Sequence, residues 1–173
     1  MLELLAPAGN LDAVIAAVQN GADAVYMGFG DGFNARRSAD NFTQESFAKA
    51  VRYCHIRGCK VYVTLNTLVG DREMDAAAAL AQQASDAGAD AILVQDLGLA
   101  RVLRAALPDI PLHASTQMSI HNLAGVEAAA EMGITRAVLA RELSLEQIRF
   151  ISQHASIETE VFVHGALCFC YSG

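Results

Sequence analysis

Short runs of β-branched and aliphatic residues alternate with longer helical runs along the whole chain. The connections from each helix to the next strand are short, and four of them carry a glycine where a helix C-cap needs positive φ. Such connections imply parallel strands joined by right-handed crossovers. The pattern predicts strands at about 2–6, 23–28, 60–66, 90–95, 110–115, 136–140 and 158–164, and helices at about 10–20, 43–57, 72–87, 97–107, 121–132 and 144–154.

Two folds have strictly alternating parallel strands: an open doubly wound sheet and a closed barrel. Seven strands with near-even spacing favour an α/β fold of the (β/α)8 TIM-barrel type, although spacing alone does not separate the two. A complete barrel has eight strands and typically ~250 residues. We therefore expect residues 1–173 to form a single incomplete barrel domain, truncated after about the seventh strand, with the remainder of the barrel and any C-terminal domains absent. Exposed strand edges would favour dimerisation.

Composition excludes several classes of protein. Apolar residues make up 53% of the chain and only three prolines occur, which argues against disorder. A net charge of -7 argues against a broadly basic surface that coats nucleic acid. Four unevenly placed cysteines do not form a secreted disulfide framework. No signal peptide and no apolar run of ~18 residues is present, so we expect a cytoplasmic protein without a membrane partner.

Polar residues gather at the carboxyl ends of the predicted strands. In a barrel these ends and the loops after them carry the functional groups. The opposite ends are mostly glycine and alanine turns. This asymmetry predicts a binding or catalytic site at the carboxyl end. The segments there are Pro7-Ala8-Gly9, Gly28-Phe29-Gly30-Asp31-Gly32, Asn66-Thr67, Gln95-Asp96, Ser115-Thr116-Gln117, Arg141-Glu142 and His164-Gly165.

Period-2 alternation inside three strands separates a polar face from an apolar one. The polar faces, which would point into the barrel, are Tyr62-Thr64-Asn66, His113-Ser115-Gln117 and Glu158-Glu160-Phe162-His164. In the last strand Val161 and Val163 would pack under helices. Buried polar groups cost ~1–3 kcal/mol each when unpaired. They either satisfy one another or line a pocket, and both interpretations stay open for Tyr62 and Glu158. For His113 a hydrogen-bonded structural role is favoured.

The glycine-rich segment 28–32 follows a strand and could bind phosphate through backbone N–H groups. Its spacing is not that of a dinucleotide site, and no Lys-Ser/Thr follows, so a plain flexible loop is favoured. Cys54 and Cys59 are interpreted as small hydrophobes. Cys168 and Cys170 lie directly after the last strand, but two thiolates alone leave a metal or cluster site half-ligated.

The segment Glu160-Val161-Phe162-Val163-His164-Gly165-Ala166-Leu167-Cys168 resembles the signature of the peptidase U-32 (collagenase-like protease) family. That signature continues, after four residues, with Gly-x-Cys, and here it breaks off after Gly173. Other blocks are similar to the family in the right order: Leu4-Leu5-Ala6-Pro7-Ala8-Gly9-Asn10, Asn20-Gly21-Ala22-Asp23-Ala24-Val25-Tyr26, Asn34-Ala35-Arg36, Ser115-Thr116-Gln117-Met118 and Arg141-Glu142-Leu143-Ser144.

The resemblance implies two kinds of activity. Some members are described as proteases, including collagenases. Others are oxygen-independent hydroxylation proteins that act on tRNA uridine, on ribosomal RNA cytidine or on the ubiquinone ring, and the tRNA enzymes draw on prephenate. The hydroxylation proteins bind a 4Fe-4S cluster through four cysteines. Cys168 matches the first of these, Cys170 matches none, and the other three would lie beyond residue 173. We therefore expect no cluster and little activity in residues 1–173 alone.

RNA hydroxylation is favoured over a peptidase, since Cys168 and His164 are four residues apart, which does not ensure contact between a thiolate and its base. A non-catalytic scaffold barrel that binds a partner is the third alternative. In the full-length protein RNA would be the substrate, or a peptide under the second hypothesis. Cys168 would be a metal-cluster ligand. The predicted substrate-binding residues are Asn34, Arg36, Asn66, Thr116 and Gln117, and the catalytic candidates are Arg141, His164 and Glu160.

Overall fold

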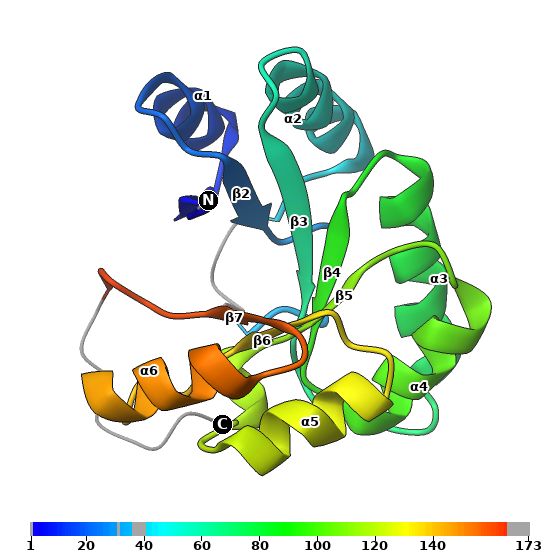
Figure 1. The fold of residues 1–173 in the computed structure, drawn as a ribbon. Coiled ribbons are helices and arrows are strands. Elements are labelled where there is room, and N and C mark those ends of the chain that lie inside the picture. The colour runs from blue at the N-terminus through cyan, green and yellow to red at the C-terminus, as the bar shows by residue number, and fades with distance from the viewer. Residues whose placement is uncertain (1, 31, 36–40, 166–173) are drawn as a thin grey trace.

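The computed structural model describes residues 2–30, 32–35 and 41–165. Its parallel strands form one sheet in chain order, which curls into an open barrel with the helices on its outer side (Figure 1). The predicted barrel topology is confirmed. The strands are β1 (Leu5–Pro7), β2 (Ala24–Met27), β3 (Lys60–Leu65), β4 (Ala91–Val94), β5 (Leu112–Ala114), β6 (Arg136–Val138) and β7 (Glu158–Glu160). The helices are α1 (Leu11–Gln19), α2 (Gln44–His55), α3 (Met74–Asp86), α4 (Leu97–Ala106), α5 (Leu123–Glu131) and α6 (Leu145–His154), with a short 3-10 helix η1 (Thr116–Met118) after β5.

The helix boundaries follow from local capping. The Asn10 side chain accepts a hydrogen bond from the Ala13 amide at the start of α1, and Ser144 and Gln147 form the predicted capping box of α6. After α1 and α3, Gly21 and the equivalent Gly88 adopt φ of 90° and 98°. These caps and glycines explain why helix positions could be read from the sequence within a few residues.

Two strands differ from their predicted ranges by more than two residues at one end. The first strand begins at Leu5, because the ladder with β2 starts there, and Leu4 is 52% exposed. The last strand ends at Glu160, not at residue 164. Its partner β6 leaves the sheet after Val138, and the Ala140 amide donates to the carbonyl of Ile120 instead. The prediction that Val161 and Val163 pack under helices is therefore wrong: the two side chains are 37% and 86% exposed.

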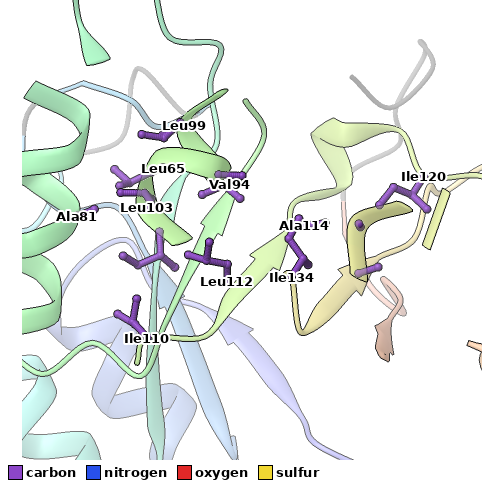
Figure 2. Close-up of a cluster of buried hydrophobic side chains, with 14 of the residues drawn as sticks. Leu65, Ala81, Val94, Leu99, Leu103, Ile110, Leu112, Ala114, Ile120 and Ile134 are labelled. Atoms are coloured by element: carbon purple, nitrogen blue, oxygen red, sulfur yellow. The ribbon is translucent and has the colours of Figure 1, made fainter. Parts of the chain in front are cut away.

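Most of the apolar core lies between the sheet and the helices, outside the barrel. Figure 2 shows the cluster in which the outer faces of β4 and β5 meet α4, with Leu65, Leu103 and Leu112 fully buried. The barrel interior is packed partly by alanines, such as Ala24 and Ala91, around Tyr62. The strand faces thus alternate as predicted for β3, with aliphatic residues facing the helices and polar or aromatic residues facing the interior.

The two cysteines of the described region belong to the apolar core. Cys54 and Cys59 are buried among the residues that connect α2 with β2 and β3. Burial raises the pKa of the Cys54 thiol to about 12 and also raises that of Cys59. A reactive cysteine requires the opposite shift. These two residues therefore act as small hydrophobes, as predicted.

Strands β1 and β7 form the two edges of the sheet, and the described ranges contain no bridge between them. The predicted dimerisation through these edges stays a prediction. Across the residues that the structure describes, no helix combines the length and the apolar character that crossing a membrane requires.

Candidate functional site

The carboxamide of Asn66 connects three loops at the carboxyl end of the barrel. Its Oδ1 accepts a hydrogen bond from the Ala35 amide (3.1 Å), in the segment after β2, and its Nδ2 donates to the Ser115 hydroxyl (3.2 Å), at the end of β5. The same hydroxyl accepts from the Gln117 amide (3.4 Å) and so caps η1. Three polar segments that are distant in sequence are thus held together at the predicted end of the barrel.

The segment from Gly28 to Phe42 leaves and re-enters the barrel mouth at a fixed base. Phe29 and Phe42 form a parallel β-bridge. Beside it, Asn34 Nδ2 donates to Asn41 Oδ1 (3.1 Å), and both amides press on Gly28, where an added Cβ would lie 2.1 and 2.2 Å from them. We call the described residues of this segment (28–30, 32–35, 41 and 42) the β2 loop. Gly28 serves this close approach, which explains one glycine of the segment without a phosphate, and the bridge and the amide pair define the base of the predicted loop.

Other predicted site residues surround the same mouth. Thr116 Oγ1 donates to the Leu139 carbonyl at 3.5 Å, at the limit of a hydrogen bond. This contact joins η1 to the end of β6. The Gln117 backbone carbonyl accepts from Gln95 Nε2 (3.4 Å). Within the described part of the chain, no hydrogen bond engages the half-buried Gln117 carboxamide. The main chain of Gln117 is therefore held by two hydrogen bonds, while its side-chain carboxamide is available to a ligand.

A cationic and aromatic pair lies beside the end of β7. The Arg141 guanidinium carbon is 5.9 Å from the centroid of the Phe162 ring, and both residues are exposed, as is His164. Arg36 and Cys168 lie outside the described residues. The structure therefore joins Asn66 and Gln117 through Ser115, places Asn34 in the β2 loop beside Ala35, and leaves Arg141 and His164 as surface groups.

The amino end of the barrel holds a charged network that sequence reasoning missed in part. Arg136 at the start of β6 is only 10% exposed in its side chain. It donates to Glu3 (2.6 Å), to Glu158 (2.6 and 2.9 Å) and to Glu160 (3.5 Å). Glu3 also accepts from the Tyr62 hydroxyl (2.8 Å). Tyr62 and Glu158 thus satisfy their polar groups within this network and also line a cavity at the same end of the barrel, where the Glu158 side chain is 68% exposed. Both interpretations left open for these two residues therefore hold.

Glu160, a predicted catalytic residue, is paired with Arg136 in this network. Its catalytic role stays a prediction. Burial raises the pKa of the Glu160 carboxyl, partly offset by Arg136. Burial also acts to raise the pKa of Glu3, but hydrogen bonds from Arg136, Lys60 and Tyr62 outweigh it and lower that pKa to about 2. Two carboxylates around one guanidinium are therefore shifted in opposite directions.

His113 lies in the interior, with its ring edge-on to Tyr62 at a centroid distance of 4.9 Å. It is 4% exposed, and burial and the nearby Arg136 lower its pKa to about 3, so the ring is neutral. Within the described residues its Nδ1 has no hydrogen-bond partner. The expected hydrogen bond of a structural histidine is absent at that atom, and packing against Tyr62 positions the ring instead.

Opposite pKa shifts predict opposite effects of two matched substitutions. Glu3, with its lowered pKa, contributes stability that is present above its ordinary pKa of 4.5 and is lost as pH falls toward 2. Glu160, with its raised pKa, favours the folded state below pH 4.5 and loses that contribution as pH rises. At pH 7 we expect Glu3→Gln to lower the free energy of unfolding by about 2 kcal/mol and Glu160→Gln not to lower it. Denaturant unfolding at pH 7 and pH 3 checks this, and equal losses for both variants at pH 7 would contradict it.

The described residues do not contain a ligand set for a metal or cluster: no group of three or more His, Cys, Asp or Glu side chains converges among them. Cys54 and Cys59 are enclosed in the core behind β2 and β3. A cluster would therefore need ligands from outside the described residues, such as Cys168.

Comparison with known proteins identifies the family. The chain matches Peptidase family U32 over residues 9–173. It is 44% identical over 172 residues to the 23S rRNA 5-hydroxycytidine C2501 synthase of Escherichia coli K12, covering 99% of this chain and 26% of that protein. It is 42% identical over 171 residues to tRNA hydroxylation protein P1 of Bacillus subtilis 168 (99% and 40%). It is 34% identical over 183 residues to a collagenase of Porphyromonas gingivalis W83 (99% and 43%).

The solved structure of the U32 peptidase Mk0906 has the same fold, with a TM-score of 0.77 at 17% identity over 93% of this chain and 68% of that one. The chain spans between about a quarter and less than half of the curated relatives it matches. With the family matched over nearly all of its length and its barrel reproduced in a solved member, the chain belongs to peptidase family U32.

Proposed function

We propose that the full-length protein is an enzyme that hydroxylates a base of RNA, in ribosomal RNA or tRNA. The observation that carries this proposal is the 44% identity, over 99% of the chain, to a 23S rRNA 5-hydroxycytidine synthase. The tRNA hydroxylation protein of Bacillus subtilis, at 42% identity, supports the same class of substrate.

The chemistry of the barrel mouth suits an unstacked base. Single-stranded RNA bases are recognised by hydrogen bonds to their edges and by stacking on aromatic rings or arginine planes. The Gln117 carboxamide offers both a donor and an acceptor, and Arg141 and Phe162 offer exposed planar groups side by side. With a net charge of -7, the chain would contact RNA through such local groups and not through a general basic surface.

The proposed cofactor is a 4Fe-4S cluster with Cys168 as one ligand, and prephenate is the candidate co-substrate. The support for the cluster is the family signature around Cys168, together with the exclusion of Cys54 and Cys59, which are buried in the core with raised pKa values. Such a protein would work in the cytoplasm, where its RNA substrates are found.

A peptidase is the second candidate, favoured by the 34% identity to a collagenase. A cysteine peptidase needs an accessible thiol of low pKa beside a base. Cys54 and Cys59 do not meet that requirement. The peptidase hypothesis therefore depends on Cys168 as nucleophile, with the exposed His164 as its base.

Genetic complementation tests the proposal. The full-length protein would be expressed in Escherichia coli lacking the 23S rRNA 5-hydroxycytidine C2501 synthase, and nucleosides from 23S rRNA and from tRNA would be analysed by mass spectrometry. We expect 5-hydroxycytidine to return at C2501, or hydroxylated uridine to rise in tRNA, with an empty vector as control. A well-expressed protein that leaves both RNAs unchanged would contradict the proposal.

A further inference from the structure

We infer that Asn66 is a positioning residue that fastens the β2 loop to the barrel mouth for substrate binding. This inference deepens the proposed function and rests on it. It adds a second role to Asn66, whose predicted contact with substrate, made from its place at the end of β3, stays a prediction.

Both halves of the Asn66 carboxamide are already engaged within the protein. Its oxygen accepts from the Ala35 amide (3.1 Å), and its nitrogen donates to the Ser115 hydroxyl (3.2 Å). A single planar amide can satisfy a backbone donor on one side and a hydroxyl on the other, which no apolar residue of the same size can do. These two hydrogen bonds use one oxygen lone pair and one N–H of the carboxamide, and the second lone pair and the second N–H remain.

Ser115 makes the anchor rigid. It is 2% exposed, its amide donates to the Val94 carbonyl (2.8 Å), and it caps η1 through the Gln117 amide. Asn66 therefore links the β2 loop, at Ala35, to the buried Ser115 at the end of β5. The segment that presents the Gln117 carboxamide and the loop that contains Asn34 are held in one arrangement by this amide.

Other contacts also hold the described part of the β2 loop. The Phe29–Phe42 bridge and the Asn34–Asn41 amide pair over Gly28 lie at its base, and Phe33 packs against the apolar core. The contact at Ala35 differs because it joins the loop to Asn66, directly after the neighbouring strand β3. Loss of Asn66 should therefore release the loop at Ala35 while the base and the core stay intact, so that substrate binding weakens more than stability.

Hydrogen exchange and RNA binding of the full-length protein test this inference with two variants. Asn66→Leu removes both hydrogen bonds at similar volume. Asn66→Asp is the matched control, because its carboxylate still accepts from Ala35 and the Ser115 hydroxyl can rotate to donate to it. We expect the Ala35 amide to exchange about tenfold faster in Asn66→Leu and within about threefold of wild type in Asn66→Asp.

The binding probe is a transcript of the 23S rRNA segment around C2501. We expect its Kd to rise about tenfold for Asn66→Leu, with the melting temperature lowered by only a few degrees. Unchanged exchange at Ala35 in Asn66→Leu would overturn the anchor. Faster exchange with unchanged Kd would overturn its role in binding.

The exchange measurement needs no substrate. It therefore tests the Asn66–Ala35 hydrogen bond even if the wild-type protein binds no RNA. Absence of RNA binding by the wild-type protein would count against the proposed function and against the role of Asn66 in binding.

Discussion

Replacing Arg136 with methionine is expected to lower the free energy of unfolding by about 3 kcal/mol. Arg136 is 10% exposed and is the shared partner of Glu3, Glu158 and Glu160. Methionine fills a similar volume but leaves the partly buried carboxylate of Glu160 without its cation and that of Glu3 with only the half-exposed Lys60. Removing one partner of such a network is strongly destabilising, because it leaves a buried charge without compensation. Replacing all the partners by apolar residues would be much less costly.

The consequence extends across the barrel. Glu3 precedes β1 and Arg136 begins β6, so their 2.6 Å hydrogen bond joins residues 133 apart in the sequence. Glu158 and Glu160 add the last strand to the same guanidinium. Arg136 thus connects the two edges of the curled sheet through its interior, and its loss should weaken the arrangement of β1 relative to β7.

Lys60→Met is the matched control. Lys60 contacts the same carboxylate, Glu3, at 3.0 Å, but its side chain is 55% exposed. An exposed pair of this kind contributes ~0.5 kcal/mol. Chemical denaturation of wild type and of both variants measures the difference. A loss below about 1 kcal/mol for Arg136→Met, or equal losses for the two variants, would show that the interior network does not carry the expected energy.

The order and type of the secondary-structure elements could be predicted because their signals are local. The capping box at Ser144 and the glycine turns at Gly21 and Gly88 each determine a boundary from a few neighbouring residues. Alternation along β3 correctly separated its helix-facing and interior faces. The exposed Val161 and Val163 mark the limit of this reasoning, because the length of β7 depends on where its partner β6 ends.

The site could be located but not resolved from the sequence. The carboxyl ends of parallel strands meet by topology, so the closeness of Asn66, Ser115 and Gln117 was predictable. Which amide satisfies which partner depends on three-dimensional positions, so the positioning contacts of Asn66 could not be predicted. The pairing of Glu3 with Arg136 was missed for the same reason: it exists only because the sheet curls.

Replacing Cys168 with alanine is expected to abolish the cluster and the hydroxylated base in the full-length protein. A 4Fe-4S cluster is held by four thiolates, and loss of one ligand usually prevents stable assembly. Cys54→Ala is the control, since Cys54 is a core residue whose pKa is raised to about 12 by burial. That variant should retain its iron, with a loss of stability of about 1 kcal/mol from the small cavity.

Anaerobic reconstitution with iron and sulfide, followed by visible absorption and iron analysis, tests the central claim that this U32 protein depends on a cluster at Cys168. We predict about four irons per wild-type protein and per Cys54→Ala protein, and close to none for Cys168→Ala. An iron-free wild-type protein, or a Cys168→Ala variant that binds iron as well as wild type, would contradict the account. The first of these results would direct attention to Cys168 as a peptidase nucleophile.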